Sequence, residues 1–170
     1  MSSVISKLEE LSRSASRKGA STSQVSTVVS SIVELNDAID KLIKYAECLA
    51  SSKGGCSQLN SASFCSSQCG STFYIKEGDS VKIWRVGNGA ISIVKGPDTL
   101  SVSSKSFGLQ VSADSFRARV WNSVVTGSLE ADQLASGSGA ILHAARKLLT
   151  KVKLASDSLA SCAREQGIKC

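Results

Sequence analysis

Two short segments of the chain alternate apolar residues with bases and indoles. Lys82 and Trp84 share one side of the first segment, and Arg117, Arg119 and Trp121 share one side of the second. Such a surface suits single-stranded nucleic acid, because phosphates pair with Lys or Arg while bases stack on the aromatic planes. The alternative interpretation is that both indoles pack against helices and the bases extend past them to solvent.

A second basic group follows near the C-terminus, at Arg146, Lys147, Lys151 and Lys153. Charges at this spacing also occur on the solvated face of an ordinary amphipathic helix. The chain carries 20 Lys and Arg against 14 Asp and Glu, which gives a net charge of +6. This modest surplus, together with the two basic groups, favours nucleic acid as a partner.

The cysteines are the other candidates for chemistry. There are six of them, Cys48, Cys56, Cys65, Cys69, Cys162 and Cys170. An even number, clustered in a segment rich in Gly and Ser, is typical of disulfides, and Cys162 is close enough in sequence to Cys170 for that pair to close the C-terminal end. Buried free thiols are the alternative interpretation.

A zinc site is a further possibility for the same residues. It would use Cys56, Cys65 and Cys69, with Cys48 or His143 as the fourth ligand. Structural zinc sites usually contain close cysteine pairs, and only Cys65 and Cys69 come near that spacing. We therefore expect no cofactor, with zinc as the minor alternative.

The sequence contains no recognisable catalytic arrangement. His143 is the single histidine, and neither a glycine-flanked serine nor a cysteine signature accompanies it. The glycine spacings give no phosphate-binding loop of the G-x-x-x-x-G-K type. We therefore expect a protein that binds rather than an enzyme.

Two segments with heptad spacing predict the long helices that would position these residues, one at 25–49 and one at 141–162. Gly137 and Gly139 predict a kink or break before the second helix. The apolar seams include Ile32, Leu35, Ile39, Leu42, Leu148, Val152 and Leu159. Heptads specify interdigitation but not the partner, so these residues either pair the helices within one chain or form an oligomer seam.

Between the helices the apolar period changes to 2, which predicts roughly five or six short antiparallel strands in a meander. Turn signals such as Asn88-Gly89 separate them. The expected fold is α+β, with the sheet flanked by the helices in a single compact domain. Its segments are a helical one at 1–53, a Cys/Ser/Gly-rich linker at 54–71, the β region at 72–126 and a second helical one at 127–170.

Hydropathy predicts no membrane helix, because no run approaches the roughly 20 consecutive apolar residues that a span requires. The first residues carry charges and serines throughout, without the apolar block of a secretory signal. We therefore expect the protein in the cytoplasm or in a virion. Disulfides there would indicate an intracellular hyperthermophile protein or an assembly exposed to oxidising conditions.

The order of long helix, β-hairpins and long helix is similar to that of prefoldin subunits, on the segments IVELNDAIDKLIKYAECL and VGNGAISIVKGPDTLSV. Prefoldin helices form paired tentacles above an assembled β platform that holds unfolded clients, so the likeness implies a chaperone-like oligomer. It is a likeness of architecture, and the serine content, the cysteine cluster and the two glycines depart from the prefoldin pattern. Small virion proteins of archaeal viruses are also similar in general appearance.

Two hypotheses follow. The first is a non-catalytic subunit or assembly protein that contacts nucleic acid through a basic and aromatic sheet face and contacts partners or further copies through its heptad helices. The alternative is a structural protein, either a prefoldin-like chaperone or a virion assembly protein, that does not bind nucleic acid. Binding that weakens with added salt would distinguish the first from the second.

Overall fold

The computed structural model describes residues 3–18, 22–52, 56–59, 62–69, 72–77, 80–85 and 89–170, with side chains at 4–14, 23–52 and 91–170. In chain order the elements are α1 (Ser3–Lys18), α2 (Thr22–Ser52), β1 (Cys56–Leu59), β2 (Ala62–Cys69), β3 (Thr72–Glu77), β4 (Ser80–Arg85), β5 (Gly89–Gly96), β6 (Thr99–Ser103), β7 (Phe107–Ser112), β8 (Ser115–Val120), β9 (Ser123–Ser128), α3 (Ala131–Ser136) and α4 (Ser138–Glu165). The predicted α+β class is confirmed, with long helices flanking a run of strands.

The strands form one sheet in which each is hydrogen-bonded to the next along the chain. All pairings are antiparallel, from β1 to β9 without a crossover. The predicted meander is confirmed, but the described residues contain nine strands rather than five or six. Two of the additional strands, β1 and β2, lie in the segment expected to be a linker. Residues 56–69 hold few apolar side chains, so the alternation that identifies strands gave no signal there.

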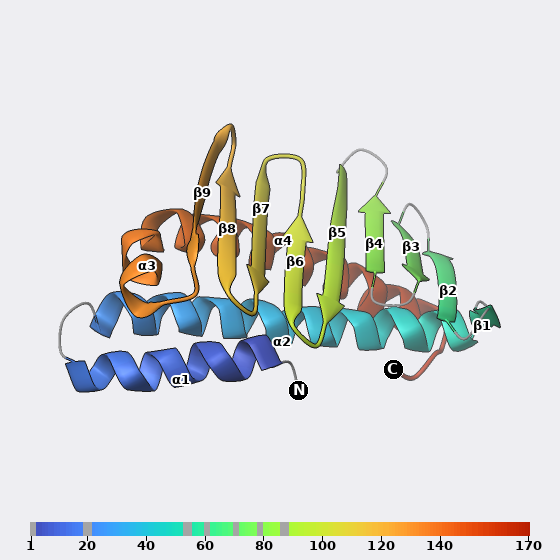
Figure 1. The fold of residues 1–170 in the computed structure, drawn as a ribbon. Helices are drawn as coiled ribbons and strands as arrows, with labels where there is room; N and C mark the ends of the chain where they lie inside the picture. Colours follow the sequence, from blue (N-terminus) through green and yellow to red (C-terminus); the bar gives the residue numbers. More distant parts are fainter. Residues whose placement is uncertain are drawn as a thin grey trace.

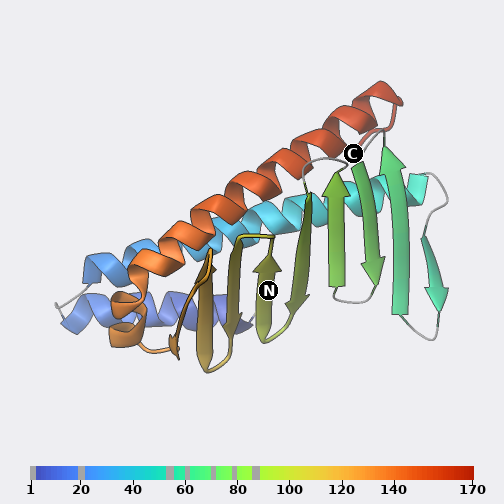
Figure 2. The same cartoon turned by 90° about the horizontal axis from the view of Figure 1, so that it is seen from above.

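The long helices α2 and α4 cover the same face of the sheet and run alongside each other across the strands (Figures 1 and 2). α1 packs against the N-terminal half of α2. The helices therefore lie against the sheet and do not project from it as prefoldin tentacles do. Within the described ranges, no helix is both long and apolar enough to cross a membrane.

The two heptad seams meet within a single chain. Ile32, Leu35, Ile39, Leu42, Leu148 and Val152 are 0% exposed and Leu159 is 2% exposed. These side chains belong to the core formed by α2, α4 and the inner sheet face. Self-association through the same residues stays a prediction, and it now requires α2 and α4 to separate first.

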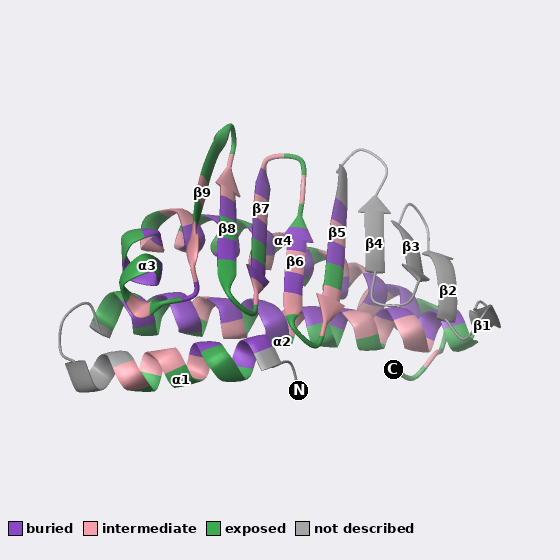
Figure 3. Cartoon of the chain, in the orientation of Figure 1, coloured by how far each residue is buried: buried purple, intermediate pink, exposed green. Residues whose placement is uncertain are grey.

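The sheet has one apolar face and one polar face, as the period of 2 predicts. On β6 to β8, the residues that face the helices are buried, and those between them are half-buried or exposed (Figure 3). We call the side away from the helices the outer face. Its residues from β5 to β8 include Ser92, Val94, Ser101, Ser103, Gln110, Ser112, Arg117 and Arg119. Apart from Val94, the residues in this list are polar or charged.

The expected break before the C-terminal helix occurs at Gly137, which separates α3 from α4. A side chain at this position would meet the buried ring of Phe116 on β8. A Cβ on Gly137 would lie 2.9 Å from Phe116 Cζ, and a Cβ on Gly127 of β9 would lie 2.7 Å from Cε1 of the same ring. Gly139 has nothing within 4 Å of the corresponding position. Packing therefore requires glycine at position 137 and does not require it at position 139.

We predict opposite effects for alanine at these two glycines. Gly137→Ala should lower the free energy of unfolding by about 1–3 kcal/mol, because the enclosed Phe116 ring has little room to move away from a new Cβ. Gly139→Ala, the matched control, should raise it by about 0.4–1 kcal/mol, because alanine restricts the unfolded chain and meets no obstacle in α4. Urea unfolding of both variants measures this difference, and equal effects would contradict the role of Phe116.

A disulfide joins the end of α2 to the C-terminal segment. Cys48 is bonded to Cys170, with their Cα atoms 6.0 Å apart. This corrects the expected pairing of Cys162 with Cys170, which rested on closeness in sequence. Cys162 is itself disulfide-bonded and buried in α4. None of the three cysteines with described side chains is therefore free, which confirms the disulfide interpretation for them.

The zinc hypothesis loses one of its ligands in this arrangement, because the sulfur of Cys48 is held in the disulfide. His143 lies against an aromatic ring of the sheet. Where side chains are described, no group of three or more His, Cys, Asp or Glu is arranged to hold a metal ion. The side chains of Cys56, Cys65 and Cys69 lie outside the described residues.

Candidate nucleic-acid interface

Trp121 is the most exposed large apolar side chain among the described residues, at 63%. It is the first residue of the two-residue turn between β8 and β9, where Val120 pairs with Ser123. Its φ of 55° lies in the left-handed region, and Asn122 after it has no positive φ. This is the sign pattern of a type II′ turn, whose first position favours glycine. An L-residue there costs roughly 1–2 kcal/mol.

The turn is fixed to the loop between β6 and β7. The Trp121 amide donates to the Ser106 carbonyl at 2.7 Å. The Arg119 guanidinium donates to the carbonyl oxygens of Lys105 at 3.1 Å and Ser104 at 2.7 Å, with longer contacts to Phe107 and Trp121. Arg119 therefore acts mainly as a clamp between the loop and the turn, although its charge stays at this edge of the sheet.

Three aromatic rings connect this edge to α4. The rings of Trp121 and Phe107 have centroids 5.4 Å apart and are tilted by 60°, and the Phe107 and His143 centroids are 5.5 Å apart. Tilted pairs at such distances are favourable. We call Trp121, Phe107 and His143 the aromatic edge. Its inner member, Phe107, is buried, so one side of the indole packs on the core while most of the ring faces solvent.

The bases of α4 divide between two flanks of the helix. Lys147 and Lys151 follow His143 at intervals of four residues, so they lie on the flank next to the aromatic edge. Lys153 forms an ion pair with Glu34 of α2 at 3.7 Å, which marks the other flank. Arg146 precedes Lys153 by two helical turns and lies on that flank. The structure therefore places Lys147 and Lys151, but not Arg146, beside the edge.

Arg117 occupies the outer face of the sheet. Its side chain is exposed, and no hydrogen bond or ion pair involves it among the described residues. It pairs in register with Gln110, which pairs with Ser101. Arg117 and Gln110 line two adjoining hollows of the outer face, of about 140 and 520 Å³. A free guanidinium beside an amide and hydroxyls can donate to phosphate oxygens.

The predicted residues Lys82 and Trp84 occupy β4, where Lys82 pairs with Ser92 and Trp84 with Ala90. The backbone position of Lys82 therefore continues the row that crosses Ser92 to Arg119 on the outer face. The side chains of both residues lie outside the described ones, so their part in the interface stays a prediction.

Two residues of this region were not expected from the sequence. Lys105 is exposed in the loop that accepts hydrogen bonds from Arg119 and Trp121. Gln110 is brought beside Arg117 by the sheet register. A basic residue in a serine-rich loop and a single glutamine in a strand carry no signal of their own, and only tertiary structure brings them to the interface.

Comparison of the chain with protein-family models, with curated proteins and with solved structures found no match.

Proposed function

We propose that this protein is a non-catalytic nucleic-acid-binding subunit whose interface combines the outer sheet face with the aromatic edge. The observation that carries this proposal is Trp121, a mostly exposed indole on backbone that favours glycine. Arg117, Lys105, Lys147 and Lys151 supply the positive charge around it.

The cost of the turn supports a binding role. Glycine at position 121 would relieve roughly 1–2 kcal/mol of backbone strain and remove an apolar ring from water. Strained backbone held by surrounding contacts is found preferentially at functional sites, so an observed outlier is a reason to look for function. The hydrogen bonds from Trp121 and Arg119 to the loop hold the ring in place before any ligand binds. Such preorganisation reduces the entropic cost of binding.

The chemistry of the interface fits a single strand. Arg117 lies in β8, and Trp121 lies in the turn at the end of the same strand. A phosphate at Arg117 and a base on the indole would thus belong to the same short stretch of an extended chain. Stacking accepts any base, and the exposed Lys105 and Lys147 add phosphate contacts without sequence preference. We therefore expect binding that depends strongly on salt and weakly on sequence.

We predict that Trp121→Gly weakens binding of labelled single-stranded DNA or RNA by roughly 5- to 100-fold, because base stacking contributes about 1–3 kcal/mol. The same substitution should not destabilise the fold, because relief of the strained φ offsets the lost contact with Phe107. Trp121→Phe is the matched control, since it keeps an aromatic plane and should retain most of the affinity. Fluorescence anisotropy measures binding, and urea unfolding measures stability.

A salt series in the same experiment separates charge from stacking. Arg117→Gln should reduce the slope of log K against log salt by about 0.7, the value expected for one phosphate contact with a single strand. Arg164→Gln changes the net charge equally at an exposed position of α4 outside both basic groups and should leave the slope unchanged. Absence of binding at low salt, or full affinity in folded Trp121→Gly, would overturn the proposal and favour a structural role without nucleic acid.

A further inference from the structure

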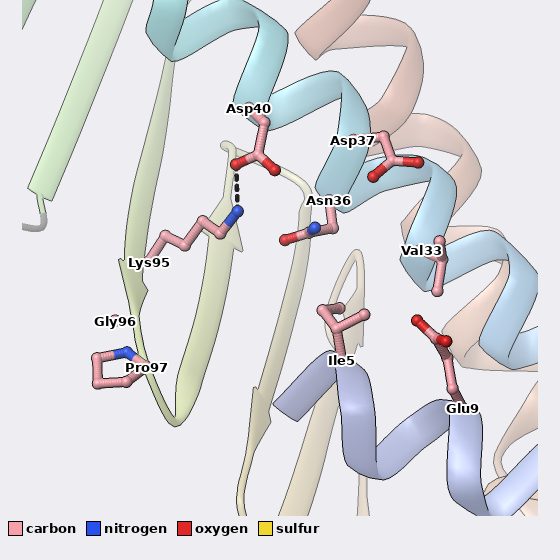
Figure 4. Close-up of a pocket in the computed structure, with 9 residues that line it drawn as sticks. All are labelled: Ile5, Glu9, Val33, Asn36, Asp37, Asp40, Lys95, Gly96 and Pro97. Carbon is pink, nitrogen blue, oxygen red and sulfur yellow. Dashed lines mark hydrogen bonds and ion pairs between the residues drawn. The ribbon is translucent and has the colours of Figure 1, made fainter. Parts of the chain in front are cut away.

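A second site lies on the helical side of the molecule, between α1, α2 and the turn from β5 to β6 (Figure 4). It is a cavity of about 490 Å³. Ile5, Val33 and Pro97 give it apolar walls, and Asn36, Asp37 and Glu9 bring polar groups to it. These helices lie on the side opposite the outer face, so the cavity is separate from the nucleic-acid interface proposed above.

Asn36 is the unusual residue of this cavity. It is 7% exposed and points from α2 into the space between the helices and β5 (Figure 4). Its Oδ1 has no hydrogen-bond partner. A buried polar atom without a partner is destabilising, and such an atom in a native protein needs an explanation.

The cavity also carries unbalanced negative charge. Asp40 forms an ion pair with Lys95 of β5, whereas Glu9 and Asp37 have no hydrogen bond or ion pair with any described residue. Three carboxylates and one ammonium therefore give a local charge of −2. Glu9, Val33 and Asp37 also line a neighbouring hollow of about 520 Å³ along the groove between α1 and α2. The unpaired carboxylates of Glu9 and Asp37 therefore line both the cavity and the neighbouring hollow.

We propose that this cavity binds a small aliphatic amine, of the diamine or polyamine class. The ammonium group donates to Asn36 Oδ1 and is neutralised by Asp37 and Glu9, while its methylene groups pack on Ile5 and Val33. An ammonium has several donors and no acceptor, which matches the carboxylates of Glu9 and Asp37 and the side-chain oxygen of Asn36. A hard cation such as Mg²⁺ requires a nearly complete shell of oxygen ligands, and the apolar walls do not provide one.

The test is titration of the whole 170-residue chain with 1,4-diaminobutane, measured by calorimetry. We expect saturable binding of one diamine per chain. Asp37→Asn and Asn36→Leu should each weaken it about tenfold or more, because each removes a partner of a charged donor. Asn36→Leu should also raise the stability of the free protein, since it removes an unpaired buried oxygen, so that loss of binding is not mistaken for loss of fold. Asp157→Asn, which removes an equal charge from exposed α4, is the matched control.

Several results would overturn the proposal. They are absence of saturable binding, equal weakening by Asp157→Asn, unchanged affinity in Asn36→Leu, or displacement of the diamine by equimolar Mg²⁺. Single-stranded DNA binding measured on Asn36→Leu should remain at the native level, so failure here and failure of the nucleic-acid interface are distinguishable.

Discussion

Replacing Leu148 with alanine is expected to lower the free energy of unfolding by about 2–5 kcal/mol, the range for removing a large aliphatic side chain from a close-packed core. Leu148 is 0% exposed at the centre of α4, where this helix meets α2 and the sheet. Two helices and the sheet meet around it, so neighbouring side chains cannot close the space by moving in one direction. Urea unfolding followed by circular dichroism measures the change.

Leu154→Ala is the matched control, because Leu154 lies on the same helix but is 61% exposed. Its effect should stay within about 0.5 kcal/mol of zero. Comparable effects of the two substitutions would contradict the packing of α4 described above.

The same measurement decides how the heptad seams are used. If Leu148 stabilises one chain, the unfolding midpoint of native protein and variant should not depend on protein concentration. If the seam joins copies, stability rises with concentration and Leu148→Ala weakens assembly. Because Leu148 of α4 and the seam residues Leu35 and Ile39 of α2 are completely buried in a single chain, we expect the first result.

The features that the sequence predicted are those that depend on local period. Ile32 to Leu42 repeat at heptad spacing, and the structure buries the whole series. Phe116 and Arg117 alternate in β8, and the structure places them on opposite sides of the sheet. In both cases one side of an element must be removed from water, so the spacing of apolar residues is sufficient information.

Features that depend on contacts between distant residues could not be predicted in this way. The break at Gly137 was expected from helix propensity, but the Phe116 ring that excludes a side chain there comes from a different element. Arg119 was expected to contact phosphates or to extend into solvent, and the path of residues 104–107 places loop carbonyls where its guanidinium donates to them. Asn36 carries no signal in the sequence, because it is the approach of α1 and β5 to α2 that buries it.

The cysteines illustrate the same limit. Spacing favoured a bond between Cys162 and Cys170, but α4 is helical through Cys162 and directs that side chain into the core. The chain after Gly167, which has a φ of 68°, continues to the end of α2, where Cys48 lies. The pairing was therefore determined by where two helices end, and no spacing in the sequence encodes that.

We predict that removing the Cys48–Cys170 bond in the Cys48→Ser, Cys170→Ser double variant lowers the free energy of unfolding by about 2–4 kcal/mol. The bond joins residues separated by 122 positions and so restricts the unfolded chain strongly. The second disulfide, at Cys162, already limits that chain, which keeps the expected effect within the ordinary range. Urea unfolding of both oxidised proteins measures the difference.

Reduction supplies the control for this prediction. With a thiol reductant present, both proteins lose the disulfide at Cys162, and the native protein also opens Cys48–Cys170. Their free energies of unfolding should then converge, because only the two side-chain oxygens of the variant still distinguish them. A difference that persists after reduction would show that the serines disturb packing at the end of α2. Equal stability of the two oxidised proteins would show that the bond does not constrain the unfolded chain, and that packing of α2 on α4 alone holds the C-terminal segment in place.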